Sequence, residues 1–127
     1  MPYIAGVDLG SGATKTVIID QSRRIVGIGL AKSQADFEAV ARRSMAAACE
    51  CAGIPRSEVV YIAATGLGRY SLDQRDIQIT DLTCAARGAH AFFPEARFVL
   101  DMGAQCTRAI SLREAGKVKA FRTNEKC

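Results

Sequence analysis

An eight-residue pattern occurs twice in this chain, and its second copy begins 93 positions after the first. Asp8–Lys15 reads DLGSGATK and Asp101–Arg108 reads DMGAQCTR, so both copies share the frame Asp-x-Gly-x-x-x-Thr-(Lys/Arg). Each copy follows a short apolar segment and leads into another, which predicts a β-hairpin with an acidic residue at the end of its first strand. The repeat therefore constrains the fold to two similar strand–turn–strand units.

The turn inside each copy has the composition of a phosphate-binding loop. Glycine lets the backbone turn tightly, so that several N–H groups can converge on an anion. The neighbouring aspartate suits a hard cation that accompanies phosphates. Asp-x-Gly after a strand is also ordinary turn chemistry, but four matched positions at one offset favour the phosphate interpretation. Two such loops would hold a nucleotide polyphosphate and its Mg²⁺ from both sides.

The composition is that of a soluble globular protein. The 127 residues are 49% hydrophobic and 24% charged, with a net charge of +4, and the length suits one ordinary domain. The longest apolar stretch is too short to span a membrane, and no leader precedes Tyr3, so we expect a cytoplasmic protein without a membrane partner. No basic stretch is interleaved with aromatic residues, which argues against nucleic acid as a partner.

The cysteines do not predict a disulfide framework. There are five, at positions 49, 51, 84, 106 and 127, and an odd number without framework spacing argues against a disulfide scaffold. Cys49 and Cys51 are two apart on a predicted helix and would point to nearly opposite sides, so they are poor joint ligands. Cys106 lies inside the second motif and Cys127 is the last residue of the sequence.

The order of the predicted elements indicates an α/β fold. Strands are expected over residues 3–7, 16–19, 25–30 and 59–64, with a short one over 77–79. A first helix is expected from Ser33 to Gly53, with Ser33 and Asp36 as its capping box, and a second from Asp81 to Phe93. This order, β-β-β-α-β-(β)-α, predicts a first ribonuclease H-like lobe over residues 1–95, with a mixed sheet and flanking helices. The small residues of the second helix would let it lie close against that sheet.

The opening three strands then recur. Residues 97–101, 107–112 and 118–122 repeat the pattern, so residues 96–127 are predicted to be the first three strands of a second, truncated lobe. Without its covering helices, the apolar side of this second sheet would self-associate, swap with another copy or collapse onto the first lobe. The Gly-rich loop at residues 64–69 is either a plain turn or an unassigned functional loop, and His90 is expected to be non-catalytic.

Four sequence blocks, in order along the chain, carry a resemblance to a known family. They are Gly6–Ser11 with Thr14–Lys15, Ala64–Arg69, Asp101–Gln105 and Asn124–Cys127. Together they resemble the family that contains the activators of 2-hydroxyacyl-CoA dehydratases and the ATP-binding subunits of benzoyl-CoA reductase. That family lies within the actin, Hsp70 and sugar-kinase superfamily of two-lobed ATPases.

The resemblance implies a function. Members bind ATP or ADP with Mg²⁺ between two lobes, and a [4Fe–4S] cluster is shared between two ATP-binding subunits in a homo- or heterodimer. ATP hydrolysis drives a low-potential electron, supplied by reduced ferredoxin or flavodoxin, to the catalytic subunits of a CoA-thioester reductase or dehydratase. The intact protein would thus be an ATP-dependent electron-transfer component of an oxidoreductase.

By motif match, the resemblance also implies the site residues. Asp8, Asp101 and Gln105 would be catalytic, and both aspartates would hold Mg²⁺ through water. Cys127 would be the first cluster ligand, since a thiolate is the usual ligand of such a cluster. The residues implied in binding the phosphates are Gly10, Ser11, Gly12, Thr14, Lys15, Gly103 and Ala104.

Departures from the family pattern leave alternatives open. The dehydratase activators read Asp-Ile-Gly-Gly-Gln-Asp at the second loop, where this chain has Ala104 and Cys106; the alanine favours the D-type subunit of benzoyl-CoA reductase. The family's adenosine-binding segment and second cluster cysteine have no counterpart in the 127 residues. We therefore expect these 127 residues alone to be inactive. A sugar- or acid-kinase-type phosphotransferase lobe and a non-enzymatic association lobe are the alternatives, and Cys127 discriminates because a kinase has no use for a thiolate there.

Overall fold

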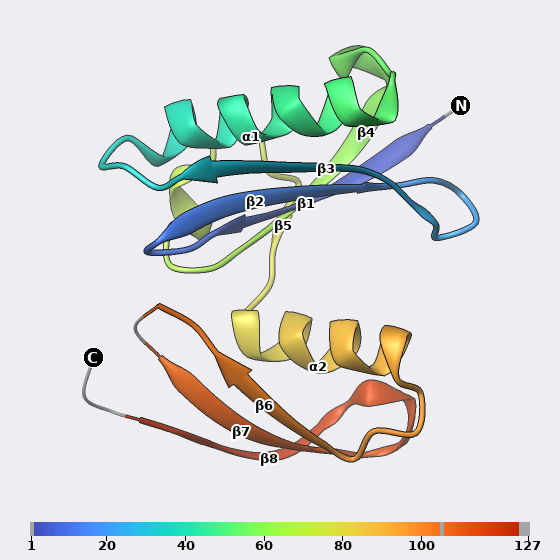
Figure 1. Cartoon of the computed structure of the whole chain (residues 1–127), viewed down its shortest axis with the longest axis vertical. Coiled ribbons are helices and arrows are strands. Elements are labelled where there is room, and N and C mark those ends of the chain that lie inside the picture. The colour runs from blue at the N-terminus through green and yellow to red at the C-terminus, as the bar shows by residue number, and fades with distance from the viewer. Residues whose placement is uncertain (1, 105, 125–127) are drawn as a thin grey trace. The chain divides into compact units, whose positions relative to one another are not determined.

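A computed structural model describes residues 2–104 and 106–124 of the chain. These residues form eight strands, two α-helices and three short 3₁₀ turns, the last being η1 (Arg56–Glu58), η2 (Arg69–Ser71) and η3 (Glu114–Gly116). They divide into two compact units, residues 1–79 and residues 80–127 (Figure 1). No helix in the described part of the chain is long and apolar enough to cross a membrane.

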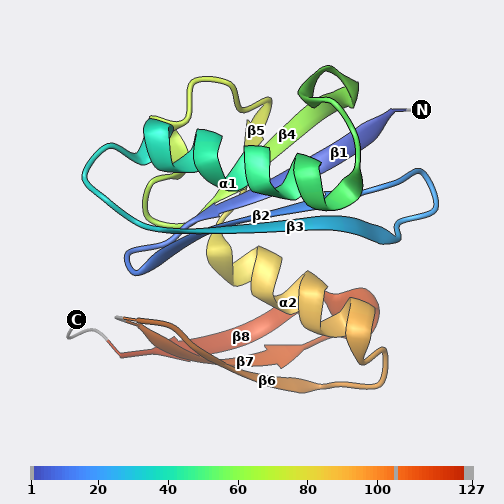
Figure 2. The ribbon, with the colours of Figure 1, turned by 45° about the horizontal axis from the view of Figure 1, so that its top comes forward.

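The first unit is a five-stranded mixed sheet in the order β3-β2-β1-β4-β5. Its strands are β1 (Tyr3–Leu9), β2 (Ala13–Ile19), β3 (Ile25–Lys32), β4 (Val59–Thr65) and β5 (Ile77–Gln78). The first three form an antiparallel meander, while β4 runs parallel to β1 and β5 parallel to β4. Helix α1 (Phe37–Ala52) lies along the meander on one face (Figure 2).

Helix α1 packs unusually close to the sheet because β3 presents glycine to it. A Cβ added at Gly29 would collide with the backbone carbonyl of Ser44, and one added at Gly27 would lie 2.8 Å from the Cβ of Ala52. The buried stripe of the helix meets alternate residues of β1 and β2, which form the main core. The residues of that core are Ala5, Val7, Leu9, Ile18, Ala41, Met45, Ala48, Cys49, Val59, Ile62, Ala64 and Leu72.

The ends of α1 correct one prediction and confirm another. Asp36, not Ser33, is the N-cap, and its carboxylate accepts a hydrogen bond of 3.2 Å from the N–H of Ala39. Ser33 lies three residues before this cap and is held at the first turn, where its hydroxyl donates to the carbonyl of Gly10 and its N–H donates to the carbonyl of Gly12. At the other end, Gly53 ends the helix with φ of 69°, in the left-handed conformation that glycine favours.

The second unit is a three-stranded antiparallel sheet in the order β6-β7-β8. Its strands are β6 (Phe98–Met102), β7 (Thr107–Leu112) and β8 (Val118–Thr123). Helix α2 (Asp81–Phe92), capped by the Thr80 side chain, packs on one face of this sheet. The core beneath it contains Ala86, Ile110 and Leu112, with Leu82, Ala85, Ala96, Val99 and Val118 around them.

The position of α2 differs from the expected one. It packs on β6–β8, where its small residues face the apolar side chains of β7. The compact units consequently divide between residues 79 and 80, whereas the expected lobe boundary lies between 95 and 96. We expected the second sheet to have no covering helix, but α2 covers one of its faces.

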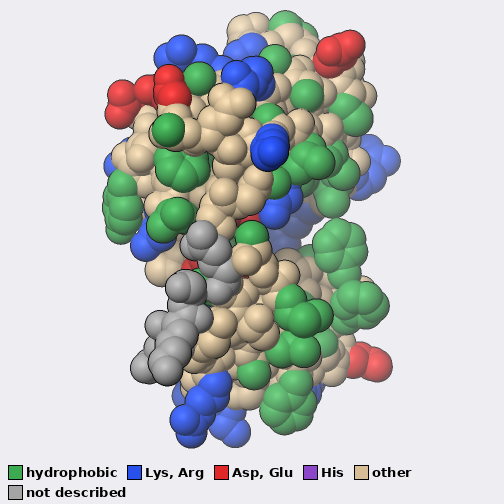
Figure 3. All heavy atoms as spheres, turned by 60° about the vertical axis from the view of Figure 1, so that its left-hand side comes forward, with side chains coloured by type: hydrophobic (Ala, Val, Ile, Leu, Met, Phe, Trp, Pro, Cys, Tyr) green, Lys and Arg blue, Asp and Glu red, His purple; other side chains and the backbone are tan. Residues whose placement is uncertain are grey.

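The other face of the second sheet remains apolar and exposed. Phe98, Leu100 and Met102 alternate with the residues that face α2, and they are 81, 62 and 72% exposed. Figure 3 shows hydrophobic side chains gathered on the surface of the second unit. An apolar face of this kind indicates a contact surface.

The repeat extends well beyond the eight-residue motif. Asp8 pairs with Lys15 across β1 and β2, and Asp101 pairs with Arg108 across β6 and β7. The register shift between Ile18 and Ile19 in the first meander recurs between Ser111 and Leu112 in the second. The offset of 93 therefore holds for the backbone pairing of three whole strands, including a β-bulge. The chain carries the same meander twice.

Candidate functional site

The first motif forms a tight turn with free backbone donors. The N–H of Gly10 donates to the carbonyl of Ala13 over 3.1 Å, which closes the turn between β1 and β2. Within the described part of the chain, the N–H groups of Ser11 and Gly12 donate to no protein acceptor. Both residues are exposed at the tip of the turn. Convergent N–H groups without partners form a concavity suited to an anion.

Ser33 supports this turn from the end of β3. Its hydroxyl donates to the carbonyl of Gly10 over 2.6 Å, and its N–H donates to the carbonyl of Gly12 over 3.2 Å. The hydroxyls of Ser33 and Thr14 also lie 3.0 Å apart in a hydrogen bond, and Thr14 is fully buried. Because both carbonyls are held by Ser33, the peptide planes of the turn are fixed. Sequence reasoning missed Ser33, since it lies 23 positions from Gly10 and its local pattern predicts a helix cap.

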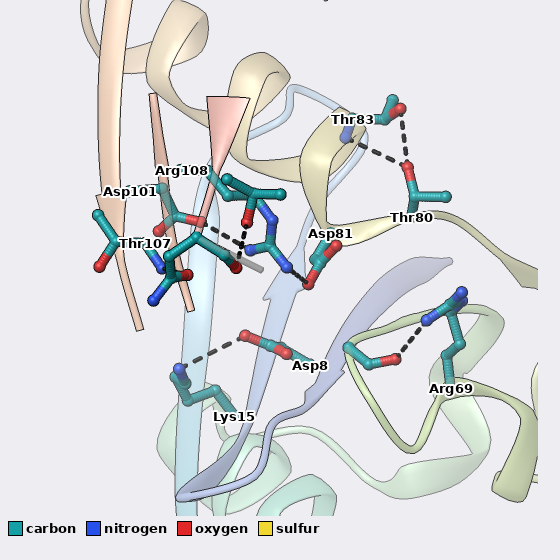
Figure 4. Close-up of polar contacts among 12 residues, drawn as sticks. Asp8, Lys15, Arg69, Thr80, Asp81, Thr83, Asp101, Thr107 and Arg108 are labelled. Carbon is teal, nitrogen blue, oxygen red and sulfur yellow. Dashed lines mark hydrogen bonds and ion pairs between the residues drawn. The ribbon is translucent and has the colours of Figure 1, made fainter. Parts of the chain in front are cut away.

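Asp8 lies at the end of β1, on the face of the sheet opposite α1. Its carboxylate is 3.4 Å from the ammonium group of Lys15, directly across on β2 (Figure 4). The two side chains are 41 and 51% exposed. An exposed ion pair of this kind contributes little to stability, roughly 0–1 kcal/mol, so both groups can be redirected toward a ligand.

The second motif reproduces the turn. The N–H of Gly103 donates to the carbonyl of Cys106 over 2.8 Å, at the positions that correspond to Gly10 and Ala13. Ala104 is exposed in this turn. After this turn, at the start of β7, the N–H of Thr107 donates to the side-chain oxygen of Asn124 over 2.9 Å. The two turns are thus closed by the same backbone hydrogen bond.

The aspartate of the second motif has a different environment. Arg108 donates to Asp101 over 3.4 Å and to Asp81 over 2.8 Å, and its side chain is only 19% exposed (Figure 4). Asp81 is the first residue of α2. One guanidinium therefore joins the β6 aspartate to the first turn of the helix. No sequence pattern indicates Asp81 as a partner of this motif.

A third loop borders Asp8. Thr65 is the partner of Asp8 across the parallel β1–β4 pair, and Gly66 follows it with φ of 90°. A Cβ at Gly66 would lie 2.6 Å from Oδ1 of Asp8, so this backbone passes directly against the carboxylate. The N–H of Gly68 donates to the carbonyl of Leu9 over 3.0 Å. The loop at residues 64–69 is therefore joined to the first motif, which its sequence alone did not indicate.

Two of the predicted site residues, Gln105 and Cys127, lie outside the described residues. Among the described residues, no group of three or more His, Cys, Asp or Glu side chains is placed to hold a metal ion. Burial raises the pKa of the Cys49 thiol, which disfavours the thiolate form that binds metals. His90, in α2, packs against Gly116. A Cβ added at Gly116 would lie 2.6 Å from the Cβ of His90.

Comparison with proteins of known sequence places the chain in a family. The profile of the BadF/BadG/BcrA/BcrD ATPase family matches residues 5–127. The activator of lactoyl-CoA dehydratase from Anaerotignum propionicum is 33% identical over 98% of this chain and 48% of its own length. The D-type subunit of benzoyl-CoA reductase from Thauera aromatica is 37% identical over 100% of this chain and 46% of its own. The chain spans about half the length of these relatives.

The fold agrees with the sequence. The activator of the 2-hydroxyisocaproyl-CoA dehydratase from Clostridium difficile, solved with bound ADPNP, superposes with a TM-score of 0.90 at 31% identity. The superposition covers 98% of this chain and 46% of that structure. The architecture is that of the actin and Hsp70-like ATPases, as the sequence predicted. This chain belongs to the BadF/BadG/BcrA/BcrD ATPase family.

Proposed function

We propose that the chain is the nucleotide-phosphate-binding half of an ATP-hydrolysing component that serves a CoA-thioester dehydratase or reductase. The observation that carries this proposal is a pair of strand connections, each beside an aspartate and each closed by a matching backbone hydrogen bond, Gly10 to Ala13 and Gly103 to Cys106. The names of the relatives, activators of acyl-CoA dehydratases and a subunit of benzoyl-CoA reductase, supply the partner class.

The residues of the first turn fit a phosphate group and a hydrated divalent cation. Ser11 and Gly12 offer unpaired N–H groups, Lys15 offers a mobile positive charge, and Asp8 offers a carboxylate. A single carboxylate with a shell of water is the usual protein contribution to Mg²⁺ that arrives with a nucleotide. Bound Mg²⁺ would neutralise charge that develops on the phosphates during hydrolysis. In the second turn, the corresponding roles belong to Asp101, Gly103, Ala104 and Gln105.

The proposal includes a [4Fe–4S] cluster that two subunits share, with Cys127 as one ligand. Its support is the resemblance at residues 124–127 and the reductase named in the relative from Thauera aromatica. A cluster requires four thiolates, and one chain end supplies one of them. Anaerobic reconstitution of this chain with iron and sulfide is therefore expected to give no fully ligated cluster at Cys127; a stable four-iron cluster there would contradict this assignment. Reduced ferredoxin or flavodoxin is the proposed donor.

The kinase and association-lobe alternatives have less support. The relatives at 33 and 37% identity are named as a dehydratase activator and as a reductase subunit. An association lobe would not need two copies of a phosphate-type motif, the first of which has open N–H donors at Ser11 and Gly12. We therefore retain the ATPase proposal.

The test is an amide NMR titration of the ¹⁵N-labelled chain with Mg-ATP. We expect shifts at Ser11, Gly12, Gly103 and Ala104. The affinity should be weaker than micromolar, so the binding free energy should be smaller in magnitude than about 8 kcal/mol. Mg-AMP, which lacks the β- and γ-phosphates, is the control and should leave these amides unchanged. No shift in either turn at millimolar Mg-ATP would overturn the proposal.

A further inference from the structure

The loop at residues 64–69 has no role in the function proposed above, yet it lies against the Asp8 carboxylate. Strands β1 and β4 are parallel and in register, and cross-strand partners in such a pair point to the same face of a sheet. Asp8 and Thr65 are partners, whereas their predecessors Val7 and Ala64 are both buried on the α1 side. The Thr65 side chain therefore lies on the same face as Asp8.

The hydroxyl of Thr65 is withdrawn from solvent and makes no hydrogen bond with any described residue. A buried polar group without a partner costs roughly 1–3 kcal/mol. Thr14 and Thr16, on β2, are also buried, but their hydroxyls bond Ser33 and Ser44. Among these three threonines, Thr65 alone holds a hydroxyl that the described part of the protein does not use.

The backbone after Thr65 is fixed so that it holds this hydroxyl in place. Gly66 has the positive φ that only glycine adopts without strain, and its carbonyl accepts from both the N–H and the guanidinium of Arg69. Gly68 donates to Leu9, the residue after Asp8. Neither glycine has room for a side chain, because a Cβ would meet Asp8 at Gly66 and Phe37 at Gly68.

We propose that Thr65 is a positioning residue of the phosphate site, whose hydroxyl bonds a water in the coordination shell of the divalent cation that Asp8 attracts. This inference rests on the proposed function. A water held by a carboxylate and a hydroxyl on adjacent strands keeps one orientation, so the cation would be placed more firmly than Asp8 alone places it. Arg69 and the two glycines support the loop and do not touch the ligand.

The experiment compares Thr65→Val with Thr65→Ser in the full chain, by amide NMR titration with ATP in the presence of Mg²⁺ and in EDTA. Valine keeps the shape of threonine without the hydroxyl, and serine keeps the hydroxyl. We expect the gain in ATP affinity that Mg²⁺ confers to fall about three- to tenfold in Thr65→Val, the amount that one hydrogen bond supplies. It should be retained in Thr65→Ser, and affinity in EDTA should be equal in all three proteins.

Thermal unfolding without ligand separates positioning from a structural role. Because the Thr65 hydroxyl bonds none of the described residues, Thr65→Val should keep or raise Tm. The matched control is Thr16→Val, which removes a hydroxyl bonded to Ser44 over 2.7 Å and should lower Tm while leaving the Mg²⁺-dependent gain unchanged.

The outcomes are distinguishable. An unchanged Mg²⁺-dependent gain in Thr65→Val, or a loss of Tm like that of Thr16→Val, would overturn the role of Thr65 and leave the proposed function standing. If the wild-type chain shows no response to Mg-ATP at all, the proposed function fails and this inference with it.

Discussion

The two copies of the meander share their backbone and differ in how their charged residues are used. In the first copy, Asp8 faces one exposed lysine, Lys15, at 3.4 Å. In the second, Asp101 and Asp81, at the start of α2, both pair with Arg108, whose side chain is largely buried. Identical strand register has therefore produced one aspartate with a mobile counter-charge and one with a fixed counter-charge. A repeat determines where a side chain lies, and its neighbours determine what it can do.

The copies also differ in which face a helix covers. Helix α1 packs on the face of Val7 and Leu9, whereas α2 packs on the face of Val99 and Ile110, which correspond by the offset to Gly6 and Val17. The face equivalent to that of Val7 is the exposed one in the second copy, with Leu100 at the matching position. Each copy thus covers the face that the other leaves open.

The largest expected effect concerns the close packing that only the first copy has. Gly29→Ala should destabilise the first unit by about 3 kcal/mol, because the added Cβ meets the backbone of Ser44 and the helix must move away. Arg122→Ala, at the corresponding position of β8, should change stability by less than about 0.5 kcal/mol. Urea unfolding followed by circular dichroism measures both. Equal losses in the two variants would mean that the second copy is as closely packed as the first.

The next prediction separates the two aspartates. Asp8→Asn should lower the Mg²⁺-dependent gain in ATP affinity about tenfold, and Asp101→Asn only about threefold, since Arg108 already offsets much of the second charge; the larger change corresponds to roughly 1.4 kcal/mol. Asp73→Asn, an exposed carboxylate outside both motifs, is the control. A larger loss in Asp101→Asn would reverse the assignment of the two environments.

Much of this fold could be predicted from the sequence, and the failures have a common physical cause. Alternating apolar residues and glycine turns predicted the strands and their repetition, because both are local properties of the chain. The predicted cap of α1 is wrong because Ser33 bonds Gly10, far away in the sequence. The packing of α2 on β6–β8 was not predicted, because a stripe of small residues fits either sheet. The partnership of Arg108 with Asp81 joins positions 27 apart and leaves no local pattern.

A smaller effect tests the fixed counter-charge of the second copy. Arg108→Lys should destabilise the second unit by about 1 kcal/mol, because an ammonium group cannot span two carboxylates as the planar guanidinium does. The reciprocal change, Lys15→Arg, replaces an exposed partner of a single carboxylate and should alter stability by less than about 0.5 kcal/mol. The free energy of unfolding in urea at low and high salt decides this. If both exchanges are neutral, the Arg108 contacts contribute no more than the surface pair at Asp8.

The smallest expected effect on stability concerns the open apolar face of the second copy. The same change should have a large effect on self-association of the chain. Leu100 is 62% exposed, while Val7, its counterpart in the first copy, is 1% exposed. Leu100→Lys should therefore change the free energy of unfolding by less than about 0.5 kcal/mol and shift the chain toward monomer in sedimentation experiments, because it places a charge in the contact surface formed with Phe98 and Met102. Ser57→Lys adds the same charge at an exposed polar position of η1, in the first unit, and serves as the control. A wild-type chain that stays monomeric at high concentration would show that this face does not drive self-association, and equal effects of the two lysines would assign the change to net charge alone.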